Sequence, residues 1–97
     1  MTTKTYAFDV ADHLHTPEEM AAYLEASIAE SDGDAAFVAK ALGDIARAKG
    51  MTDLARATGL GRESLYKALS ADGNPQLSTV LKVAKALGLQ FTVRPAA

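Results

Sequence analysis

The stretch TDLARATGLGRESLYKALS, residues 52–70, contains two short segments with apolar stripes on either side of Gly59-Leu60-Gly61. Each segment is about two helical turns long. A glycine reverses the chain with a positive φ at little steric cost, and Gly59 stands at the required position. Two short helices that cross closely need a small residue at the crossing, and Ala55 supplies it. The spacing therefore predicts a helix-turn-helix unit.

Six residues of this stretch have structural roles in the predicted unit. The leucines are spaced to bury the inner faces of both helices, while the alanine and the glycine permit the crossing and the turn. The set consists of Leu54, Ala55, Gly59, Leu60, Leu65 and Leu69. A two-helix hairpin in an ordinary bundle is the alternative; it explains the same residues, although bundles usually have longer helices.

The outer face of the second helix carries side chains that can contact DNA, namely Arg62, Glu63, Ser64, Tyr66 and Lys67. Arg62 can bridge O6 and N7 of guanine, Lys67 can bind guanine or phosphate, and Glu63 can accept from N4 of cytosine. Glu63 can equally pair with Lys67 on the same helix. Tyr66 suits packing or a phosphate contact better than base reading. We predict that the helix of residues 62–70 enters the major groove.

The formal charge of −2 is the sum of two unlike halves. Residues 1–39 contain one basic and eight acidic residues, a charge of −7, and residues 40–97 contain nine basic and four acidic residues, a charge of +5. This asymmetry favours a basic surface for a polyanion and an acidic segment with another partner. Chance scatter of solvated charges is the alternative.

Length and composition exclude several classes of protein. A chain of 97 residues is sufficient for one compact domain, and we treat residues 1–97 as a single domain. The absence of cysteine excludes a disulfide scaffold, a zinc ribbon, an iron–sulfur site and a thiol nucleophile. No apolar run can span a membrane, and residues 1–6 lack the apolar core of a signal peptide. We therefore expect a cytoplasmic protein with no membrane partner.

Three further helices are predicted around the unit. The residues Thr16-Pro17-Glu18-Glu19 are typical of a helix start, and Ser31-Asp32-Gly33 ends that helix. Asp34 can cap a second helix that ends at Gly50, and Gly88 can cap the end of the last helix. The apolar stripes are Met20, Tyr23, Leu24, Ser27 and Ile28; Phe37, Val38, Ala41, Leu42 and Ile45; and Leu77, Val80, Leu81, Ala84 and Leu87.

Two short segments, residues 6–10 and 89–93, alternate between apolar and polar or small residues, which is the period of a half-buried strand. We expect them to form dimer contacts or to pair at an edge, and the pattern leaves both open.

Several stretches resemble one known family: residues 42–51 (LGDIARAKGM), 54–70, 73–75 (GNP) and 79–89 (TVLKVAKALGL). The likeness extends into the acidic N-terminal part through residues 8–11 and 22–26. They are similar to the addiction-module antidote proteins, bacterial antitoxins with a phage-repressor-like (Cro/Xre-type) helix-turn-helix. The resemblance covers nearly the whole chain. Gly61 is a departure, because many relatives carry serine or another capping residue at that position.

The resemblance implies a five-helix DNA-binding fold, dimerisation and a small toxin partner of the RelE/ParE type. By position, Arg62, Glu63 and Lys67 would read bases, and Ser64, Thr52 and Asn74 would lie near phosphates. The predicted fold is mainly α: a five-helix phage-repressor-like helix-turn-helix domain with short N- and C-terminal β-strands. Residues 1–39 would form an acidic strand and helix, and residues 40–97 the basic helix-turn-helix region with the C-terminal strand.

The predicted function is that of an antitoxin of a type II toxin–antitoxin module. It would be a homodimer that represses transcription at a palindromic operator on double-stranded DNA and neutralises its toxin by direct binding. Because many such toxins are basic, the acidic segment is the expected toxin-binding surface. The alternatives are a plain Cro/Xre-type repressor without a toxin, and a protein-interaction module with a vestigial helix-turn-helix.

We predict no catalysis, no metal and no cofactor. His13 and His15 would need further metal ligands, and a solvated turn explains them. The glycines at positions 59 and 61 resemble a dinucleotide fingerprint but follow a predicted helix rather than a strand. A helix cap explains the neighbouring carboxylates of Glu18 and Glu19.

Overall fold

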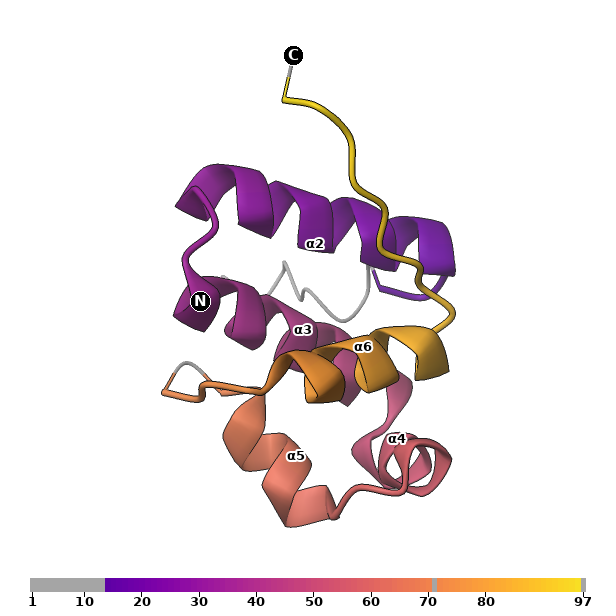
Figure 1. The fold of residues 1–97 in the computed structure, drawn as a ribbon. Helices are drawn as coiled ribbons and strands as arrows, with labels where there is room; N and C mark the ends of the chain where they lie inside the picture. Colours follow the sequence, from indigo (N-terminus) through magenta and orange to yellow (C-terminus); the bar gives the residue numbers. More distant parts are fainter. Residues whose placement is uncertain (1–13, 71, 97) are drawn as a thin grey trace, which may run out of the picture.

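The computed structural model describes residues 14–70 and 72–96 of the chain (Figure 1). Five helices make up the regular structure of this part: α2 (Pro17–Ser31), α3 (Ala35–Lys49), α4 (Met51–Thr58), α5 (Arg62–Ala68) and α6 (Leu77–Ala86). The mainly helical, five-helix prediction is confirmed. None of the helices in these two ranges is long and apolar enough to cross a membrane.

The start of α2 is a complete capping box. Thr16 Oγ1 accepts from the backbone N–H of Glu19 at 3.1 Å, and Glu19 Oε1 accepts from the backbone N–H groups of His15 at 2.9 Å and Thr16 at 3.1 Å. These hydrogen bonds stabilise the carboxylate, so they lower the pKa of Glu19 below its ordinary value of 4.5, with the His15 bond contributing most. The helix start predicted from these residues is confirmed.

The ends of the other long helices also follow local signals. Asp34 Oδ1 accepts from the N–H of Ala36 at the start of α3, and Gly50, with a φ of 119°, ends that helix. After α6, the N–H of Gly88 donates to Lys85 O at 3.0 Å and the N–H of Leu89 donates to Ala84 O at 2.8 Å. This pair of bonds is a Schellman motif, and Gly88 has the positive φ, 81°, that the motif requires.

The hydrophobic core lies around α3. Figure 1 shows α2 on one side of α3, with α4 and α5 on the other, and α6 alongside. α2 packs against α3, and α4 packs against α3, α5 and α6. The largest fully buried side chains are Leu42, Ile45, Leu65, Leu69 and Val83. The core therefore holds α4 and α5 at the end of the molecule farthest from α2.

Some residues of the predicted apolar stripes are exposed instead. Phe37 and Leu77 are 45% and 70% exposed, and Ile28 and Leu81 also lie at the surface, whereas Val83, outside the predicted stripe, is fully buried. In α6, apolar residues cover more than one face, so periodicity does not reveal which face packs inward. Contact with α3 and α4 selects the face that carries Val83.

The predicted strand at residues 89–93 is wrong, since the structure has no strand there. The chain leaves α6 through Leu89, which packs on the core, and then passes alongside α2 (Figure 1). A strand needs a second strand to satisfy its backbone hydrogen bonds, and its neighbour here is a helix. The other predicted strand, residues 6–10, lies outside the described residues.

Candidate nucleic-acid interface

The turn between α4 and α5 is built from local hydrogen bonds. Gly59 has a φ of 74°, and its N–H donates to Ala55 O at 2.9 Å. Thr58 Oγ1 donates to Leu54 O at 2.8 Å and accepts from the N–H of Leu60 at 3.3 Å. The threonine thus ties the end of α4 to the first residue after the glycine, a role that the sequence analysis did not assign.

The inner faces of α4 and α5 are packed into the core. Leu54, Leu65 and Leu69 are buried, while Ala55 and Leu60 are partly buried against them. Because these residues occupy one side of each helix, the opposite side of α5 is left in solvent.

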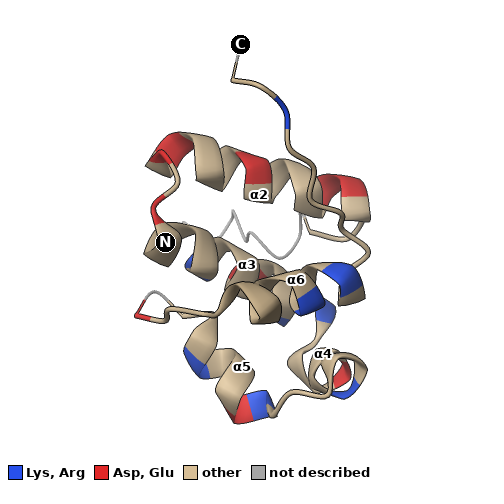
Figure 2. Ribbon diagram, viewed as in Figure 1, with Lys and Arg blue, Asp and Glu red and all other residues tan. Residues whose placement is uncertain are grey.

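The outer face of α5 brings together the five side chains predicted to contact DNA: Arg62, Glu63, Ser64, Tyr66 and Lys67 are all exposed. Figure 2 shows charged residues at both ends of this helix. The described residues form three ion pairs, and neither Glu63 nor Lys67 belongs to any of them. The ion pair between Glu63 and Lys67, considered above as an alternative, is therefore not formed in this structure.

Arg62 and Tyr66 contact each other on this face. The guanidinium carbon of Arg62 lies 5.2 Å from the centroid of the Tyr66 ring, within the range of a cation–π interaction. The ring restricts the arginine to part of its conformational range while leaving its N–H donors available. Spacing alone did not predict this contact.

The two other predicted phosphate-contacting residues lie outside α5. Thr52 is exposed in the first turn of α4. Asn74 is exposed in the loop between α5 and α6, where it also lines a hollow shared with Ile28 and Val38. The structure thus places these residues on separate elements, one before and one after α5 in the chain.

Charge is distributed unevenly among the helices. α2 carries four glutamates and no lysine or arginine, whereas each of α3, α4, α5 and α6 carries basic residues (Figure 2). On α4, Arg56 is paired with Asp53 at 3.4 Å. The α5 face therefore belongs to the basic part of the molecule.

A family model described as "Probable addiction module antidote protein" matches residues 4–95. The chain belongs to this family. An uncharacterized protein of Haemophilus influenzae strain Rd is 50% identical over 94 residues, which cover 97% of this chain and 95% of that protein. No solved structure matches the chain. The antidote-family resemblance inferred from the sequence is confirmed, and the family description implies a toxin partner in general terms.

In this member of the antidote family, two glycines missed by the sequence analysis position α5. Gly43 is buried in α3, and a Cβ at this position would collide with the carbonyl oxygen of Leu69. A Cβ at Gly73 would collide with the carbonyl oxygen of Ala68. Glycine is required where backbones approach this closely. The position of Gly43 inside a predicted helix is the feature of the sequence that could have indicated this close approach.

A polar cluster around Asp44 of α3 joins this helix to α2. Tyr23 Oη donates to Asp44 Oδ2 at 2.7 Å, Arg47 Nη2 donates to Asp44 Oδ1 at 2.8 Å, and Lys40 Nζ lies 3.5 Å from Asp44 Oδ2. Burial, followed by the bond to Asp44, raises the pKa of Tyr23 to about 12. These groups are used in helix packing and do not belong to the α5 face.

His15 does not contribute to this face. His15 precedes α2, where its backbone N–H donates to Glu19, and His13 lies outside the described residues. Within residues 14–70 and 72–96, no group of three or more histidine, aspartate or glutamate side chains is placed to hold a metal ion.

Proposed function

We propose that this antidote-family protein is the antitoxin of a type II toxin–antitoxin module and that it represses its own promoter by binding DNA through a helix-turn-helix formed by α4 and α5. The observation that carries the proposal is the outer face of α5. Its five polar and aromatic side chains are exposed, whereas the leucines on its inner side are buried in the core.

The dimensions and chemistry of α5 suit a major groove. Seven helical residues extend about 10 Å, and the groove is about 12 Å wide. Arg62 would bind O6 and N7 of guanine, Lys67 would bind guanine or phosphate, and Glu63 would accept from cytosine. Ser64, Thr52 and Asn74 would contact phosphates, while Tyr66 would hold the arginine in place.

We propose a homodimer on a palindromic operator. A two-fold axis would place two copies of α5 in successive turns of the major groove, with half-sites about 34–36 Å apart. This arrangement is based on the resemblance to phage repressors. Two copies of α5 would contact two half-sites, whereas one short helix would contact only one.

The DNA-binding proposal is tested by gel-shift titration of promoter duplexes at two salt concentrations. We expect Arg62→Ala to weaken binding by about 1–3 kcal/mol and to relax specificity at one base pair. Arg94→Ala is the matched control, because Arg94 lies on the C-terminal segment that passes α2. Failure to bind any promoter duplex at low salt would contradict the proposal. A uniform loss across all sequences would instead make Arg62 a phosphate contact.

The proposed toxin is a small protein of the RelE/ParE type, bound by the acidic side of the molecule. Support comes from the family description and from the unbalanced negative charge of α2. Co-expression of the full chain with the product of the adjacent reading frame provides the test, and we expect the two proteins to co-purify. If both elute separately while the promoter is still bound, the protein is a plain repressor. If it binds a partner but no DNA, its helix-turn-helix is vestigial.

A further inference from the structure

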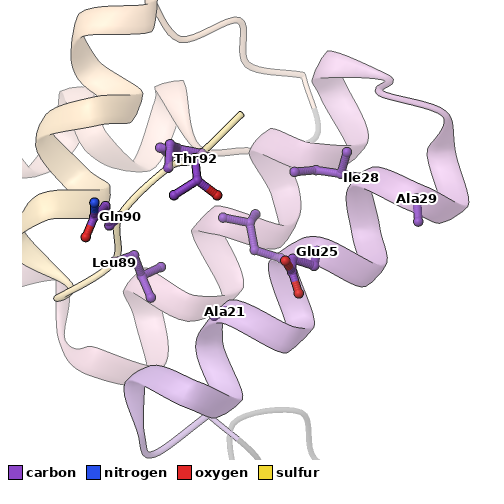
Figure 3. Close-up of a pocket in the computed structure, with 9 residues that line it drawn as sticks. Ala21, Glu25, Ile28, Ala29, Leu89, Gln90 and Thr92 are labelled. Atoms are coloured by element: carbon purple, nitrogen blue, oxygen red, sulfur yellow. The ribbon is translucent and has the colours of Figure 1, made fainter. Parts of the chain in front are cut away.

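We infer that a groove between α2 and residues 89–92 binds a cationic, amphipathic segment of the toxin. This inference rests on the proposed function and adds the position of the toxin site and its chemistry. The groove has a volume of about 380 Å³. Its α2 wall includes Ala21, Leu24, Glu25 and Ile28, and its other wall includes Leu89 and Phe91 (Figure 3).

The α2 wall is one face of that helix, and it is apolar except for Glu25. Residues 21, 24, 25 and 28 are spaced i, i+3, i+4 and i+7, so they share one helix face. Met20 and Ser27 are buried in the core, whereas Ile28 remains 39% exposed. No other described helix lines this groove, and residues 89–92 of the C-terminal segment form its second wall.

The C-terminal wall presents apolar side chains to solvent as well. Phe91 is 43% exposed, and Val93, one residue beyond the groove lining, is 97% exposed. Aromatic side chains are enriched at protein interfaces, and the exposed apolar side chains of this wall are available for contact with a partner.

The negative charge of α2 indicates that the segment bound in the groove is cationic. Glu25 lies in the groove wall, α2 also carries Glu18, Glu19 and Glu30, and residues 14–39 contain no lysine or arginine. The cation of the C-terminal segment, Arg94, follows the lining residues. A partner segment with apolar side chains flanked by lysine or arginine therefore complements both the surface and its charge.

The same charges disfavour a second copy of this chain in the groove. In a two-fold dimer each patch meets its own copy, so the two acidic faces of α2 would oppose each other. The groove also lies on the side of α3 opposite α5, so its occupant would leave the proposed DNA-binding face free (Figure 1).

Binding of the purified product of the adjacent reading frame to the full chain tests the apolar part of the inference. We expect Phe91→Lys and Ile28→Lys each to weaken binding by about tenfold or more. Phe37→Lys is the matched control, because Phe37 is 45% exposed but lies on α3 and does not line the groove. This control should bind within about twofold of the wild type.

A charge series tests the chemistry of the occupant. We expect Glu25→Gln to slow the association of the chain with the adjacent product, and Glu25→Lys to slow it further. High salt should reduce the difference in association rate between these variants and the wild type. Circular dichroism should remain unchanged in all variants, because the altered residues are exposed. Promoter binding should remain unchanged in the Phe91 and Glu25 variants, because these residues line the groove on the side of α3 opposite α5.

The outcomes distinguish this inference from the proposed function. If the wild type binds the adjacent product but Phe91→Lys and Ile28→Lys bind it equally well, the groove assignment is wrong and the antitoxin proposal stands. If the wild type does not bind the product, both fail. If the groove variants change the oligomeric state of the chain in sedimentation experiments but do not change its binding of the product, the groove is an interface between two copies. That result would overturn the inference.

Discussion

Tyr23 Oη donates a 2.7 Å hydrogen bond to Asp44 Oδ2, and this bond joins α2 to α3. The next residue toward the N-terminus, Gly43, lies against the carbonyl oxygen of Leu69 just after α5. Two consecutive residues of α3 thus hold the acidic helix and the proposed DNA-binding helix. The relative positions of the two proposed surfaces depend on this short part of α3.

Removal of the Tyr23 hydroxyl should destabilise the protein. We expect Tyr23→Phe to lower the free energy of unfolding by about 1–2 kcal/mol, because Asp44 is charged and loses a hydrogen-bond donor. Urea unfolding measures the effect. Tyr66→Phe is the control, since its ring still supports Arg62 and the described residues provide no hydrogen bond to its hydroxyl. Equal unfolding midpoints for the two variants would show that the Tyr23–Asp44 bond contributes nothing.

The same tyrosine should make stability depend on alkaline pH. Its pKa is raised from 10.0 to about 12 in the folded protein, so the folded state retains this proton at pH values where the unfolded state releases it. The stabilisation is complete below pH 10 and is lost as pH rises to about 12. Unfolding titrations at pH 8 to 12 should show a steeper decline for the wild type than for Tyr23→Phe. Parallel curves would disprove this linkage.

A methyl group at Gly43 should disrupt the packing of α5 on α3. We expect Gly43→Ala to cost about 1–3 kcal/mol through overpacking and also to weaken promoter binding. Gly61→Ala is the matched control, because Gly61 has a φ of −68° and an added Cβ would make only an ordinary contact, 3.5 Å from Ser64 Oγ. Thermal and urea unfolding provide the readout. A Gly43→Ala protein as stable as the control would contradict the close approach.

Two leucines that the sequence pattern places on inward-facing helix positions should differ sharply in their contribution to stability. Leu65 is fully buried, so we expect Leu65→Ala to cost about 2–5 kcal/mol. Leu77 is largely exposed, and Leu77→Ala should change stability by no more than about 0.5 kcal/mol. Chemical denaturation of both variants checks the difference. A large loss for Leu77→Ala would mean that this leucine is covered in solution.

The helices could be predicted because their signals are local. Thr16 and Glu19 form their capping box within one turn, Asp34 caps the start of α3, and Gly59 adopts the positive φ expected for the turn. Hydrogen bonds between near neighbours depend little on the rest of the chain. The exposed face of α5 could be predicted for the same reason, since helical spacing places its polar residues opposite its leucines.

Contacts between distant residues could not be predicted in this way. Periodicity did not identify the buried face of α6, because its apolar residues lie on more than one side and only packing selects Val83. The alternating pattern of residues 89–93 did not produce a strand, since the neighbouring element is a helix. Nothing in the spacing identified Leu69 as the neighbour of Gly43.

Local signals in the sequence were enough to predict the five helices, the turn at Gly59 and the concentration of negative charge in the N-terminal half. These properties arise from local hydrogen bonding and from residue composition. The positions of α2 and α5 on opposite sides of α3, and the groove between α2 and the C-terminal segment, became visible in the folded chain. Burial and close backbone approach depend on which surfaces meet, and this depends on the packing of the whole chain.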